Sequence, residues 1–592
     1  MGILAQIADA VDGYNRQVEA DVQAARSDAD RGRQILEKWR TIRQSIPETT
    51  TPTGIRLPRL ALPDYDEPGQ IARYLGEEGL PGEFPFVASA YREMYLEPEH
   101  ATPGGNGSPA RHVEEPTRLF AGLGLAEDTN ARFHYLTQHQ RSARLSTAFD
   151  GPTLYGMDSD ADGVFGKIGE GGVAVDTVED MERLYDGFDL SCATGDVSTS
   201  MTINGPAPTI LAMYIAAAKR RFGDDVVPRL RGTIQADILK EVQAQNETLF
   251  PVEASLRFLG DMVEWVSEHM PRFYPISISG YHIAEAGATP VQQAAYTVSN
   301  GFAYVEMFKA RGMDIARFGP RLSFFLDCGL DIEYWALARV CRKLWAIGMR
   351  DVFGADDRSQ RFKLHTQTSG RSLIAAEFKN NLTRTAIELL MSYANATNSC
   401  HSNSADEPFT TPGEEYVRLA AQAQSIMLEE SGLFKHMMNT IPGSPGMRAV
   451  EKAVEAAILE EFREMDRLGG VLAAVEQRYQ RSQIQAAAHR LESQIYDGTR
   501  PIIGLNRYAS EHAGFKEVVR TPVDRQRLAV ERLQSFKVAN SEAAAAALDK
   551  LSQVVESGGN VFAELLNAVE VCSLGQITER LHEVAGVYRP TV

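Results

Sequence analysis

The sequence lacks the features that mark secreted, membrane-spanning and disulfide-rich proteins. Its 592 residues contain five cysteines, which are far apart and form no Cys-x-x-Cys pair. An odd, scattered set of thiols is typical of a reducing compartment and argues against a thiolate zinc site. No apolar run approaches the roughly 18 residues of a membrane span, and Asp9 and Asp12 interrupt the first apolar stretch, which argues against a signal peptide. We therefore expect a cytoplasmic protein with no membrane contact.

Positive charge is scarce relative to negative charge. There are 60 Lys and Arg residues against 79 Asp and Glu residues, which gives a net charge of −19. An acidic surface repels the phosphate backbone, so we expect no nucleic-acid partner. A local cluster of cations could still bind an anionic ligand. The composition, with 44% hydrophobic and 23% charged residues, is that of a globular protein long enough for several domains.

Motifs for dinucleotide binding and for metal binding are also missing. No Gly-x-Gly-x-x-Gly follows an early strand, which disfavours a dinucleotide-binding fold. No His-x-His or His-Glu-x-x-His is present, so a metal site would have no local signature.

Changes in residue pattern divide the chain into three parts. Residues 1–45 have helical periodicity, whereas residues 46–110 are rich in proline, glycine and charge, as in an extended arm with a loop. We predict that residues 1–110 contact a partner, that residues 111–440 form the catalytic domain, and that residues 441–592 form a helical region. For residues 46–110, a plain linker is an equal alternative.

The middle part predicts a barrel. Repeated alternation of β-like runs with helical stretches favours a parallel sheet with right-handed crossovers. Seven or eight such units over roughly 300 residues fit a (β/α)8 barrel better than an open sheet. The predicted fold class is therefore α/β, a TIM barrel with an N-terminal arm and a C-terminal helical region. The clearest β-like runs are residues 145–149, 198–203, 232–235, 276–279, 322–326, 362–367 and 396–401.

The predicted strands carry small polar side chains at alternate positions. Residues two apart on a strand share one face, so these side chains would line the barrel axis if their apolar neighbours pack under the helices. Such a lining leaves room for a long, thin ligand. The alternative is that these strands lie at exposed edges. The sets that share a face are Ser198, Ser200 and Thr202; Thr233 and Gln235; Ser277 and Ser279; and Thr366 and Thr368.

Three histidines follow three different predicted strands. His282, His365 and His401 should meet at one mouth of the barrel, where barrel active sites form. A single histidine is more often structural, but three together favour a site. Two kinds of site compete: a divalent metal held by these histidines and a carboxylate, or a metal-free site that hydrogen-bonds a carbonyl group.

Long ordered motifs occur along the chain, among them LSTAFDGPTLYGMDSD (145–160), STSMTINGP (198–206), SISGYHIAEAGAT (277–289) and LHTQTSGRSL (364–373). These segments resemble the large, acyl-CoA-binding subunit of the adenosylcobalamin-dependent acyl-CoA mutases, the methylmalonyl-CoA mutase family. The resemblance runs from about residue 75 to the C-terminus. It implies a barrel with the pantetheine of coenzyme A along its axis, cobalamin across its mouth, and radical 1,2-migration of the thioester carbonyl group.

The resemblance also implies partners. The family's cobalamin-binding domain contains Asp-x-His-x-x-Gly, and none of the twelve histidines here has Asp two residues before it. We therefore expect a separate small subunit that shares adenosylcobalamin with this chain and contacts the arm of residues 1–110. A homodimer of large subunits within a heterotetramer, and a G-protein chaperone, are further implications.

The matched motifs imply roles for individual residues. His282 matches the group that hydrogen-bonds the migrating thioester carbonyl, with Tyr281 and Gln235 as further catalytic positions. The positions that face the substrate are Phe120, Ala148, Ser200, Thr202, Thr233, Gln245, Arg321 and Ser323. The positions that face the cofactor are His365, Gln367, Asn403 and Glu407, with Glu407 at the deoxyadenosyl ribose.

Two of these positions discriminate between substrates within the family. Methylmalonyl-type members place Tyr at position 120 and Arg at position 245, where this chain has Phe120 and Gln245. A free carboxylate in a dry pocket needs a cation, because a buried unpaired charge costs several kcal/mol. The resemblance thus implies a non-carboxylated acyl group, of the isobutyryl-CoA/n-butyryl-CoA type. The 2-hydroxyisobutyryl type has Asp at position 148, so Ala148 speaks against that substrate.

Other positions depart from the family pattern. Glu115, Gly151 and Arg371 are atypical, and a loop is inserted near residues 96–110. These departures leave open a bulkier or hydroxylated acyl group, of the pivalyl-CoA or 2-hydroxyisobutyryl-CoA type. A non-catalytic CoA-binding paralogue and a metal-dependent barrel hydrolase are the remaining alternatives.

Overall fold

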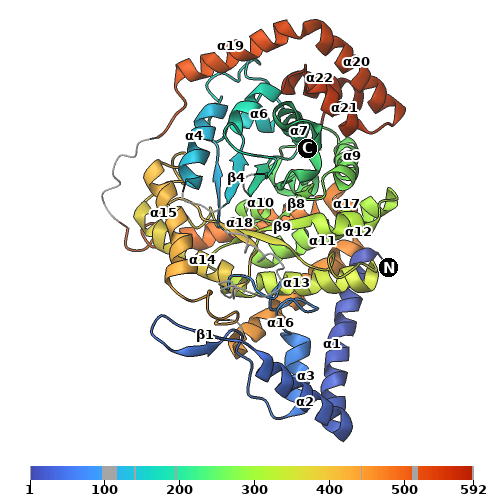
Figure 1. The fold of residues 1–592 in the computed structure, drawn as a ribbon, viewed down its shortest axis with the longest axis vertical. Helices are drawn as coiled ribbons and strands as arrows, with labels where there is room; N and C mark the ends of the chain where they lie inside the picture. Colours follow the sequence, from blue (N-terminus) through green and yellow to red (C-terminus); the bar gives the residue numbers. More distant parts are fainter. Residues whose placement is uncertain are drawn as a thin grey trace.

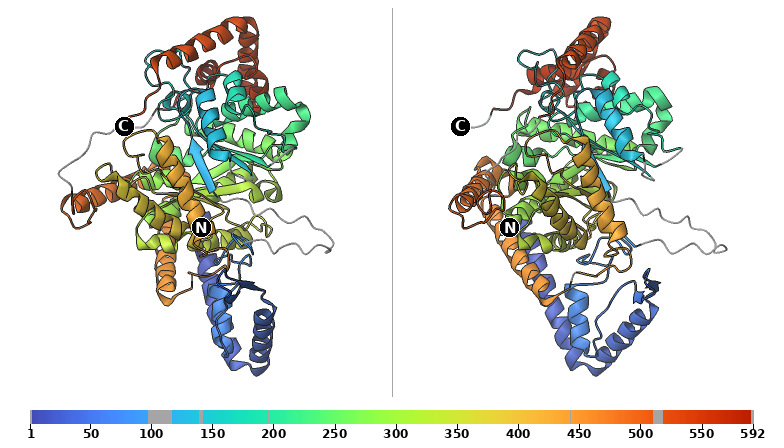
Figure 2. Two further views of the ribbon diagram at one scale, coloured as in Figure 1. Left: turned by 60° about the vertical axis from the view of Figure 1, so that its left-hand side comes forward. Right: turned by 90° about the vertical axis from the view of Figure 1, so that its left-hand side faces the viewer.

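The computed structural model describes residues 2–96, 117–138, 142–193, 196–441, 443–509 and 518–589. The molecule is elongated, with a β/α barrel in its middle, the first helices at one end and the last helices at the other (Figure 1). Figure 2 shows the same order from two further sides. Glu115 and the inserted loop, apart from Leu96, lie outside the described residues. Within these ranges no helix combines the length and apolar character needed to cross a bilayer.

Eight parallel strands close into the barrel. Hydrogen-bonded neighbours follow the order β7-β6-β5-β4-β3-β11-β10-β9-β8. β7 (Phe273–Tyr274) and β8 (Ile276–Ser279) are two halves of one strand that is interrupted at Pro275, which has no N–H to donate. β7 pairs with β6 and β8 pairs with β9, so the ring is complete and the predicted TIM barrel is confirmed. The other strands are β3 (Thr117–Ala121), β4 (Ala143–Ala148), β5 (Val197–Thr202), β6 (Gly232–Ile234), β9 (Leu322–Cys328), β10 (Leu364–Thr368) and β11 (Ser399–His401).

A layer of helices surrounds the strands. α7 is buried along residues 207–218, because it packs between the barrel and the C-terminal helices. The helices that follow the strands are α4 (Ala126–Thr137), α6 (Val178–Leu184), α7 (Ala207–Phe222), α9 (Val252–His269), α11 (Pro290–Ala310), α13 (Leu337–Ile347), α14 (Asn381–Ala394) and α15 (Glu414–Ser425).

One strand, β3, was not among the strands predicted from the sequence. Its residues TRLFA include a charged side chain and form only a short apolar run.

Alternation along the strands separates the helix side from the bore. As predicted, the apolar residues Met201, Ile203, Ile276 and Ile278 are buried. Their neighbours Ser200 and Thr202 stay partly exposed, as expected for side chains that face an open bore.

The prediction was wrong for β10. Thr366 and Thr368 are buried on the helix side, where Thr366 Oγ1 bonds Thr397 Oγ1 at 3.1 Å. His365 and Gln367 occupy the face that was predicted for the threonines. The register was ambiguous in the sequence because both faces of this strand carry polar side chains.

The N-terminal arm is more helical than its sequence predicts. Residues 1–45 form two helices, α1 (Ile3–Ser27) and α2 (Ala29–Ser45). They are separated at Asp28, whose Oδ1 accepts the N–H groups of Asp30 and Arg31 and so begins α2. The hairpin of β1 (Glu48–Thr50) and β2 (Arg56–Pro58) follows. α3 (Pro68–Glu77) lies in the segment predicted to be extended.

The C-terminal residues form two groups of helices. α16 (Pro445–Arg467), α17 (Val471–Glu476) and α18 (Tyr479–Tyr496) pack near the barrel, and α16 contacts both α1 and α11. The second group lies at the opposite end of the molecule from the arm (Figure 1). It consists of α19 (Val523–Ala539), α20 (Ser541–Ser557), α21 (Val561–Ala568) and α22 (Leu574–Ala585).

Candidate functional site

His282 lies at the carboxyl end of β8, in the first turn of α10 (Tyr281–Glu285). Its Nδ1 is 2.8 Å from Ser279 Oγ. The backbone N–H of Ser279 donates to Asp237 Oδ2 at 2.7 Å, which fixes the position of the serine. Burial lowers the pKa of His282 well below its usual value, and the charge of Lys240 lowers it further. The imidazole is therefore neutral near pH 7, and with Ser279 donating to Nδ1 its Nε2–H can donate to a ligand oxygen.

Tyr281 is held by a stack and by a hydrogen bond. Its ring lies parallel to that of Phe325, with centroids 5.0 Å apart. Its hydroxyl accepts from Gln367 Nε2 at 3.0 Å, and the same nitrogen is 2.7 Å from Asn403 Oδ1. Burial and the nearby carboxylates of Glu285 and Glu407 raise the pKa of Tyr281, so the phenol keeps its proton and can donate it in a hydrogen bond.

Two phenylalanines line the mouth beside the other predicted histidines. His365 packs against Phe325 with ring centroids 4.9 Å apart, and His401 packs edge-on against Phe120 at 5.1 Å. Burial lowers the pKa of His401 to about 4 and that of His365 well below its usual value, so both rings are neutral. Phe325 was not predicted as a site residue, because it reads as one of several apolar residues in its strand.

The two ring nitrogens of His365 differ in their hydrogen bonding. Its Nδ1 is 2.8 Å from Ser399 Oγ, while its Nε2 is buried with no hydrogen-bond partner among the described residues. An orphaned polar atom of this kind is rare in protein interiors and fits a site that a ligand completes.

All three histidines have an aromatic neighbour. Each histidine packs against Phe120 or Phe325; for His282 the distance to the Phe325 centroid is 5.8 Å. In the part of the chain that the structure describes, no three His, Cys, Asp or Glu side chains are arranged to hold a metal ion.

Gln235 is buried and belongs to a polar network that reaches the Ser279–His282 pair. Its Oε1 accepts from Asn204 Nδ2 at 3.0 Å, and Asn204 Oδ1 accepts from the Asp237 N–H at 3.0 Å. Asp237 Oδ1 accepts from Tyr304 at 2.6 Å, and burial raises the pKa of this carboxyl group. The network orients Gln235 and, through Asp237, the Ser279–His282 pair.

Glu407 lies in the loop after β11. Its Oε2 accepts the N–H of Ser404 at 3.1 Å, and its side chain reaches solvent. Desolvation by the surrounding protein, with the charges of Glu285 and Asp406, raises its pKa to about 7. A carboxylate at this position can accept hydrogen bonds from the hydroxyls of a ligand.

The bore below this mouth is lined by hydroxyl groups. Ser200 pairs in register with Ser146 on one side and with Thr233 on the other. Ser200, Thr233 and Ser323 are partly exposed, whereas Ser146 Oγ is buried with no partner among the described residues. The predicted polar lining therefore holds for Ser200 of β5 and Thr233 of β6, and Ser323 of β9 adds a further hydroxyl.

Positive charge gathers at the other end of the bore. A pocket of about 630 Å³ lies where the strands begin. Asp196 is the one acid among its described lining residues and lies 2.6 Å from Arg231. Burial, followed by the charges of Arg358 and Arg317, lowers the pKa of Arg321, as expected where like charges crowd together. The cations that line the pocket are Arg118, Arg144, Arg231, Arg272, Arg317, Arg321, Arg358 and Lys363.

The remaining predicted positions lie near the mouth. Ala148 ends β4, and Gln245 ends the π-helical turn η2 (Glu241–Gln245). A Cβ added at Gly151 would meet no atom within 4 Å, so the space there is open. The atypical Arg371 is accommodated because its Nη2 reaches Tyr334 Oη at 3.3 Å and Asp327 Oδ2 at 3.6 Å.

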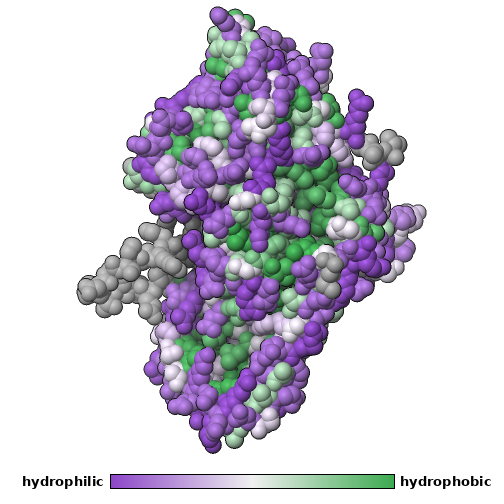
Figure 3. All heavy atoms as spheres, turned by 90° about the vertical axis from the view of Figure 1, so that its right-hand side faces the viewer, coloured by the Kyte–Doolittle hydropathy of each residue, from purple (hydrophilic) through white to green (hydrophobic). Residues whose placement is uncertain are grey.

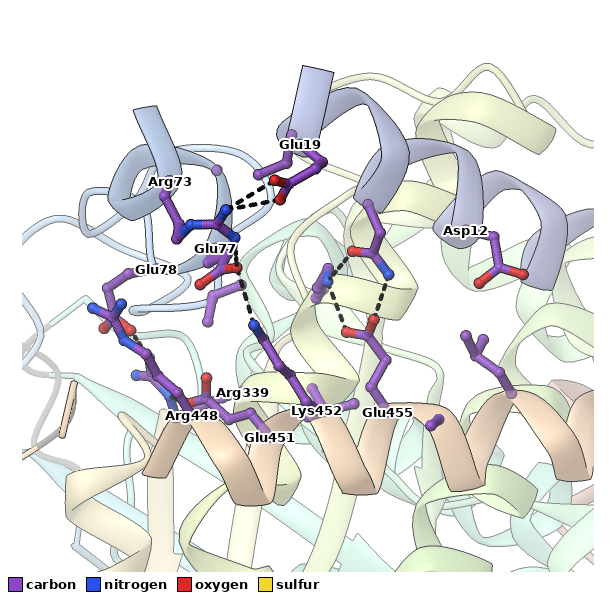
Figure 4. Close-up of a pocket in the computed structure, with 18 residues that line it drawn as sticks. Asp12, Glu19, Arg73, Glu77, Glu78, Arg339, Arg448, Glu451, Lys452 and Glu455 are labelled. Carbon is purple, nitrogen blue, oxygen red and sulfur yellow. Dashed lines mark hydrogen bonds and ion pairs between the residues drawn. The ribbon is translucent and has the colours of Figure 1, made fainter. Parts of the chain in front are cut away.

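A second pocket, of about 370 Å³, lies between the arm and the barrel (Figure 4). Its charged side chains bind one another: Arg73 bridges Glu19 and Glu77, and Lys343 binds Glu455 at 2.7 Å. These contacts join α1, α3, α13 and α16, so the pocket is a joint between the arm and the body of the molecule.

Comparisons with known proteins agree with this architecture. Residues 51–587 match the family model described as methylmalonyl-CoA mutase. The fused isobutyryl-CoA mutase of Geobacillus kaustophilus is 42% identical over 587 residues, which cover 94% of this chain and 52% of that protein. The corresponding protein of Cupriavidus metallidurans is 44% identical over 567 residues, covering 91% of this chain and 50% of that protein.

A third relative has a length similar to that of this chain. The 2-hydroxyisobutanoyl-CoA mutase large subunit of Aquincola tertiaricarbonis is 35% identical over 526 residues, 87% of this chain and 89% of that protein. By contrast, the chain spans about half the length of the fused relatives. Because the family model covers nearly all of the barrel and the helices that follow it, the chain belongs to the methylmalonyl-CoA mutase family.

Proposed function

We propose that this chain is the acyl-CoA-binding large subunit of an adenosylcobalamin-dependent isomerase, a mutase for a non-carboxylated acyl-CoA of the isobutyryl-CoA/n-butyryl-CoA type. The observation that carries the proposal is the bore. It is cationic where the strands begin, lined by hydroxyls along its length, and bounded by neutral imidazole and aromatic rings at the mouth. These three environments match the phosphates, the pantetheine and the acyl head of a CoA thioester.

In this proposal the residues of the mouth bind and orient the thioester. His282 donates from Nε2 to the thioester carbonyl oxygen, while Phe120, Phe325 and Tyr281 keep water away from the acyl group. Adenosylcobalamin, when bound, supplies the radical chemistry. The orphaned Nε2 of His365 and the exposed carboxylate of Glu407 are polar groups at the mouth that fit the hydroxyls of that cofactor.

We also propose that cobalamin is carried by a separate small subunit. In support, one relative of similar length is itself named a large subunit. Hydrophobic residues gather in a hollow on one face of the molecule (Figure 3). The segments after β4 and β9 expose Tyr155, Met157, Phe165, Leu330 and Ile332. Contact through the arm of residues 1–110, a heterotetramer with two large subunits, and a G-protein chaperone are parts of the same proposal.

Three positions near the mouth favour an acyl group without a carboxylate or a hydroxyl. Phe120 and Gln245 offer no cation to a substrate carboxylate, and Ala148 offers no acceptor to a substrate hydroxyl. Gly151, which begins the short helix after β4 and carries no side chain, makes a bulkier branched acyl group, of the pivalyl type, the second candidate.

The test is turnover by the chain assembled with its cobalamin-binding partner and adenosylcobalamin. We expect product from isobutyryl-CoA and none from methylmalonyl-CoA, measured by mass spectrometry of the acyl-CoA pool. Conversion of methylmalonyl-CoA but not isobutyryl-CoA would contradict the assignment. Tight binding of both thioesters without turnover of either, or of a pivalyl-CoA control, would instead support a non-catalytic CoA-binding paralogue.

The cationic pocket gives a separate prediction. Arg317 and Arg358 line it, are exposed and have no ion pair among the described residues. Replacing both with alanine should weaken binding of CoA thioesters about tenfold or more, because charged hydrogen bonds to phosphate contribute about 1.5–3 kcal/mol each. Isothermal titration would measure the loss, with Arg33→Ala/Arg467→Ala as a control of equal charge change. Binding of a pantetheine thioester, which lacks the nucleotide, should not change; an equal loss for both ligands would contradict the phosphate assignment.

A further inference from the structure

The segment that carries Gln245 begins with a buried ion pair. Lys240 precedes η2 directly, and its Nζ lies 2.5 Å from Glu241 Oε1, with both side chains fully buried. Lys240 Nζ also donates to Gln245 Oε1. The charge of this lysine is therefore already balanced by Glu241, and Gln245 receives from it only a hydrogen bond.

Glu247 holds the other end of the Gln245 amide. Gln245 Nε2 donates to Glu247 Oε1 at 2.8 Å. The chain reverses at Asn246, which has a left-handed backbone with φ of 70°, and the Glu247 N–H then donates to Glu241 Oε2 at 2.8 Å. Glu247 Oε2 is buried with no partner among the described residues. Both ends of the Gln245 amide are thus occupied by protein, and the cluster contains one carboxylate more than it has cations.

The charges of this cluster reach the mouth of the barrel. Burial lowers the pKa of His282, and the charge of Lys240 lowers it further. Burial raises the pKa of Tyr155, which follows β4, and the charges of Glu247 and Glu241 add to that rise. Burial and the charge of Glu241 raise the pKa of Glu247 itself to about 7, as expected for a carboxyl group without its own cation.

One further cation approaches the segment from outside the cluster. Arg481 of α18 donates to the Val242 carbonyl and to Asn246 Oδ1. Its contacts are therefore with backbone and amide oxygens, and they leave the carboxylate of Glu247 without an ion pair in the described structure.

We propose that Glu247 is a specificity-determining residue that excludes carboxylated acyl groups, because it places an uncompensated carboxylate beside Gln245. The inference rests on the proposed acyl-CoA function. It has a consequence for position 245: the arginine that methylmalonyl-type members have there would, in this chain, pair with Glu247 and offer no net positive charge to a substrate. Rejection of a substrate by like charge is a common basis of specificity.

The test uses two thioesters that differ only by a carboxylate in place of a methyl group, methylmalonyl-CoA and isobutyryl-CoA. Their dissociation constants are measured at pH 8, where Glu247 is ionised, with the chain assembled with its cobalamin-binding partner and adenosylcobalamin. The variants are Glu247→Gln, Gln245→Arg and the double variant. Glu253→Gln, an exposed position at the start of α9, is the matched control.

We expect Glu247→Gln to bind methylmalonyl-CoA about tenfold more tightly than wild type, since like charges in contact cost several kcal/mol. Gln245→Arg alone should change that affinity less than about threefold, whereas the double variant should gain about 100-fold, a coupling typical of contacting residues. Glu253→Gln should leave both affinities within about threefold of wild type, and in Glu247→Gln the gain in affinity for methylmalonyl-CoA should exceed any change for isobutyryl-CoA.

Two failures are distinguishable. If wild type binds isobutyryl-CoA and rejects methylmalonyl-CoA, but Glu247→Gln behaves as Glu253→Gln or Gln245→Arg alone matches the double variant, the role of Glu247 is wrong and the proposed function stands. If wild type binds neither thioester, the proposed function is wrong and this inference falls with it.

Discussion

His282→Ala should lower the turnover of the acyl-CoA about 10²- to 10⁴-fold and change its dissociation constant less than about threefold. The reason is that a hydrogen bond to the thioester carbonyl contributes most when negative charge builds on that oxygen during migration. In the structure the donor is prepared for this task, because Ser279 Oγ lies 2.8 Å from Nδ1 and leaves Nε2 for the substrate. Single-turnover rates and equilibrium binding, measured on the assembled enzyme, separate the two effects.

Two further variants make this result interpretable. Ser279→Ala should lose part of the rate, because the imidazole would remain but lose its orientation. His489→Ala, at an exposed position of α18, should behave as wild type. Equal losses of binding and turnover in His282→Ala would show that the histidine only binds the thioester.

Arg339→Met should lower the free energy of unfolding by about 3–5 kcal/mol, the usual cost of breaking a buried ion pair from one side. Arg339 is fully buried in α13, and its Nη2 lies 2.5 Å from Glu78 Oε2 at the end of α3, while its Nε binds Glu451 of α16. The two carboxylates raise the pKa of this guanidinium. Without Arg339 both carboxylates would be left without their cation at the joint between arm and body (Figure 4).

Urea denaturation followed by circular dichroism would measure the loss. Arg467→Met removes an exposed guanidinium paired within α16 and should cost less than about 1 kcal/mol. Limited proteolysis gives a second readout, since cleavage between α2 and α3 should become faster only in Arg339→Met. A loss below about 1 kcal/mol for Arg339→Met would show that the arm is held by its apolar contacts instead.

The fold was largely predictable because its signals are local. Alternating β-like and helical runs indicated the barrel, and apolar residues such as Ile276 and Ile278 indicated which strand face meets the helices. The errors arose where that contrast is weak. β3 has a charged residue in its second position, and β10 carries polar side chains on both faces, so the alternation did not reveal which of His365 and Thr366 faces the bore.

The site was predictable only in part. The histidines at strand ends were visible as single residues, and the resemblance added positions such as Gln245. The environment of Gln245 was not visible, because a left-handed turn at Asn246 brings Glu247 back to the amide. Of the cations that line the pocket, only Arg321 was predicted as a site residue, and the others were missed for a different reason. Their side chains come from separate strand starts between Arg118 and Lys363, and no short segment is basic in a chain with a net charge of −19.

The two ends of the bore differ in charge, and this difference favours entry of an anionic ligand from one end only. The phosphates of a CoA thioester are attracted to the end near Arg321, whereas the neutral rings near His282 carry no charge that would attract them. If the thioester enters at the first end and the cobalamin carrier docks at the second, the two do not compete for the same opening of the barrel. Free coenzyme A should then slow the binding of the acyl-CoA substrate without displacing the carrier. Its inhibition should be competitive with the acyl-CoA and should not depend on the concentration of the carrier.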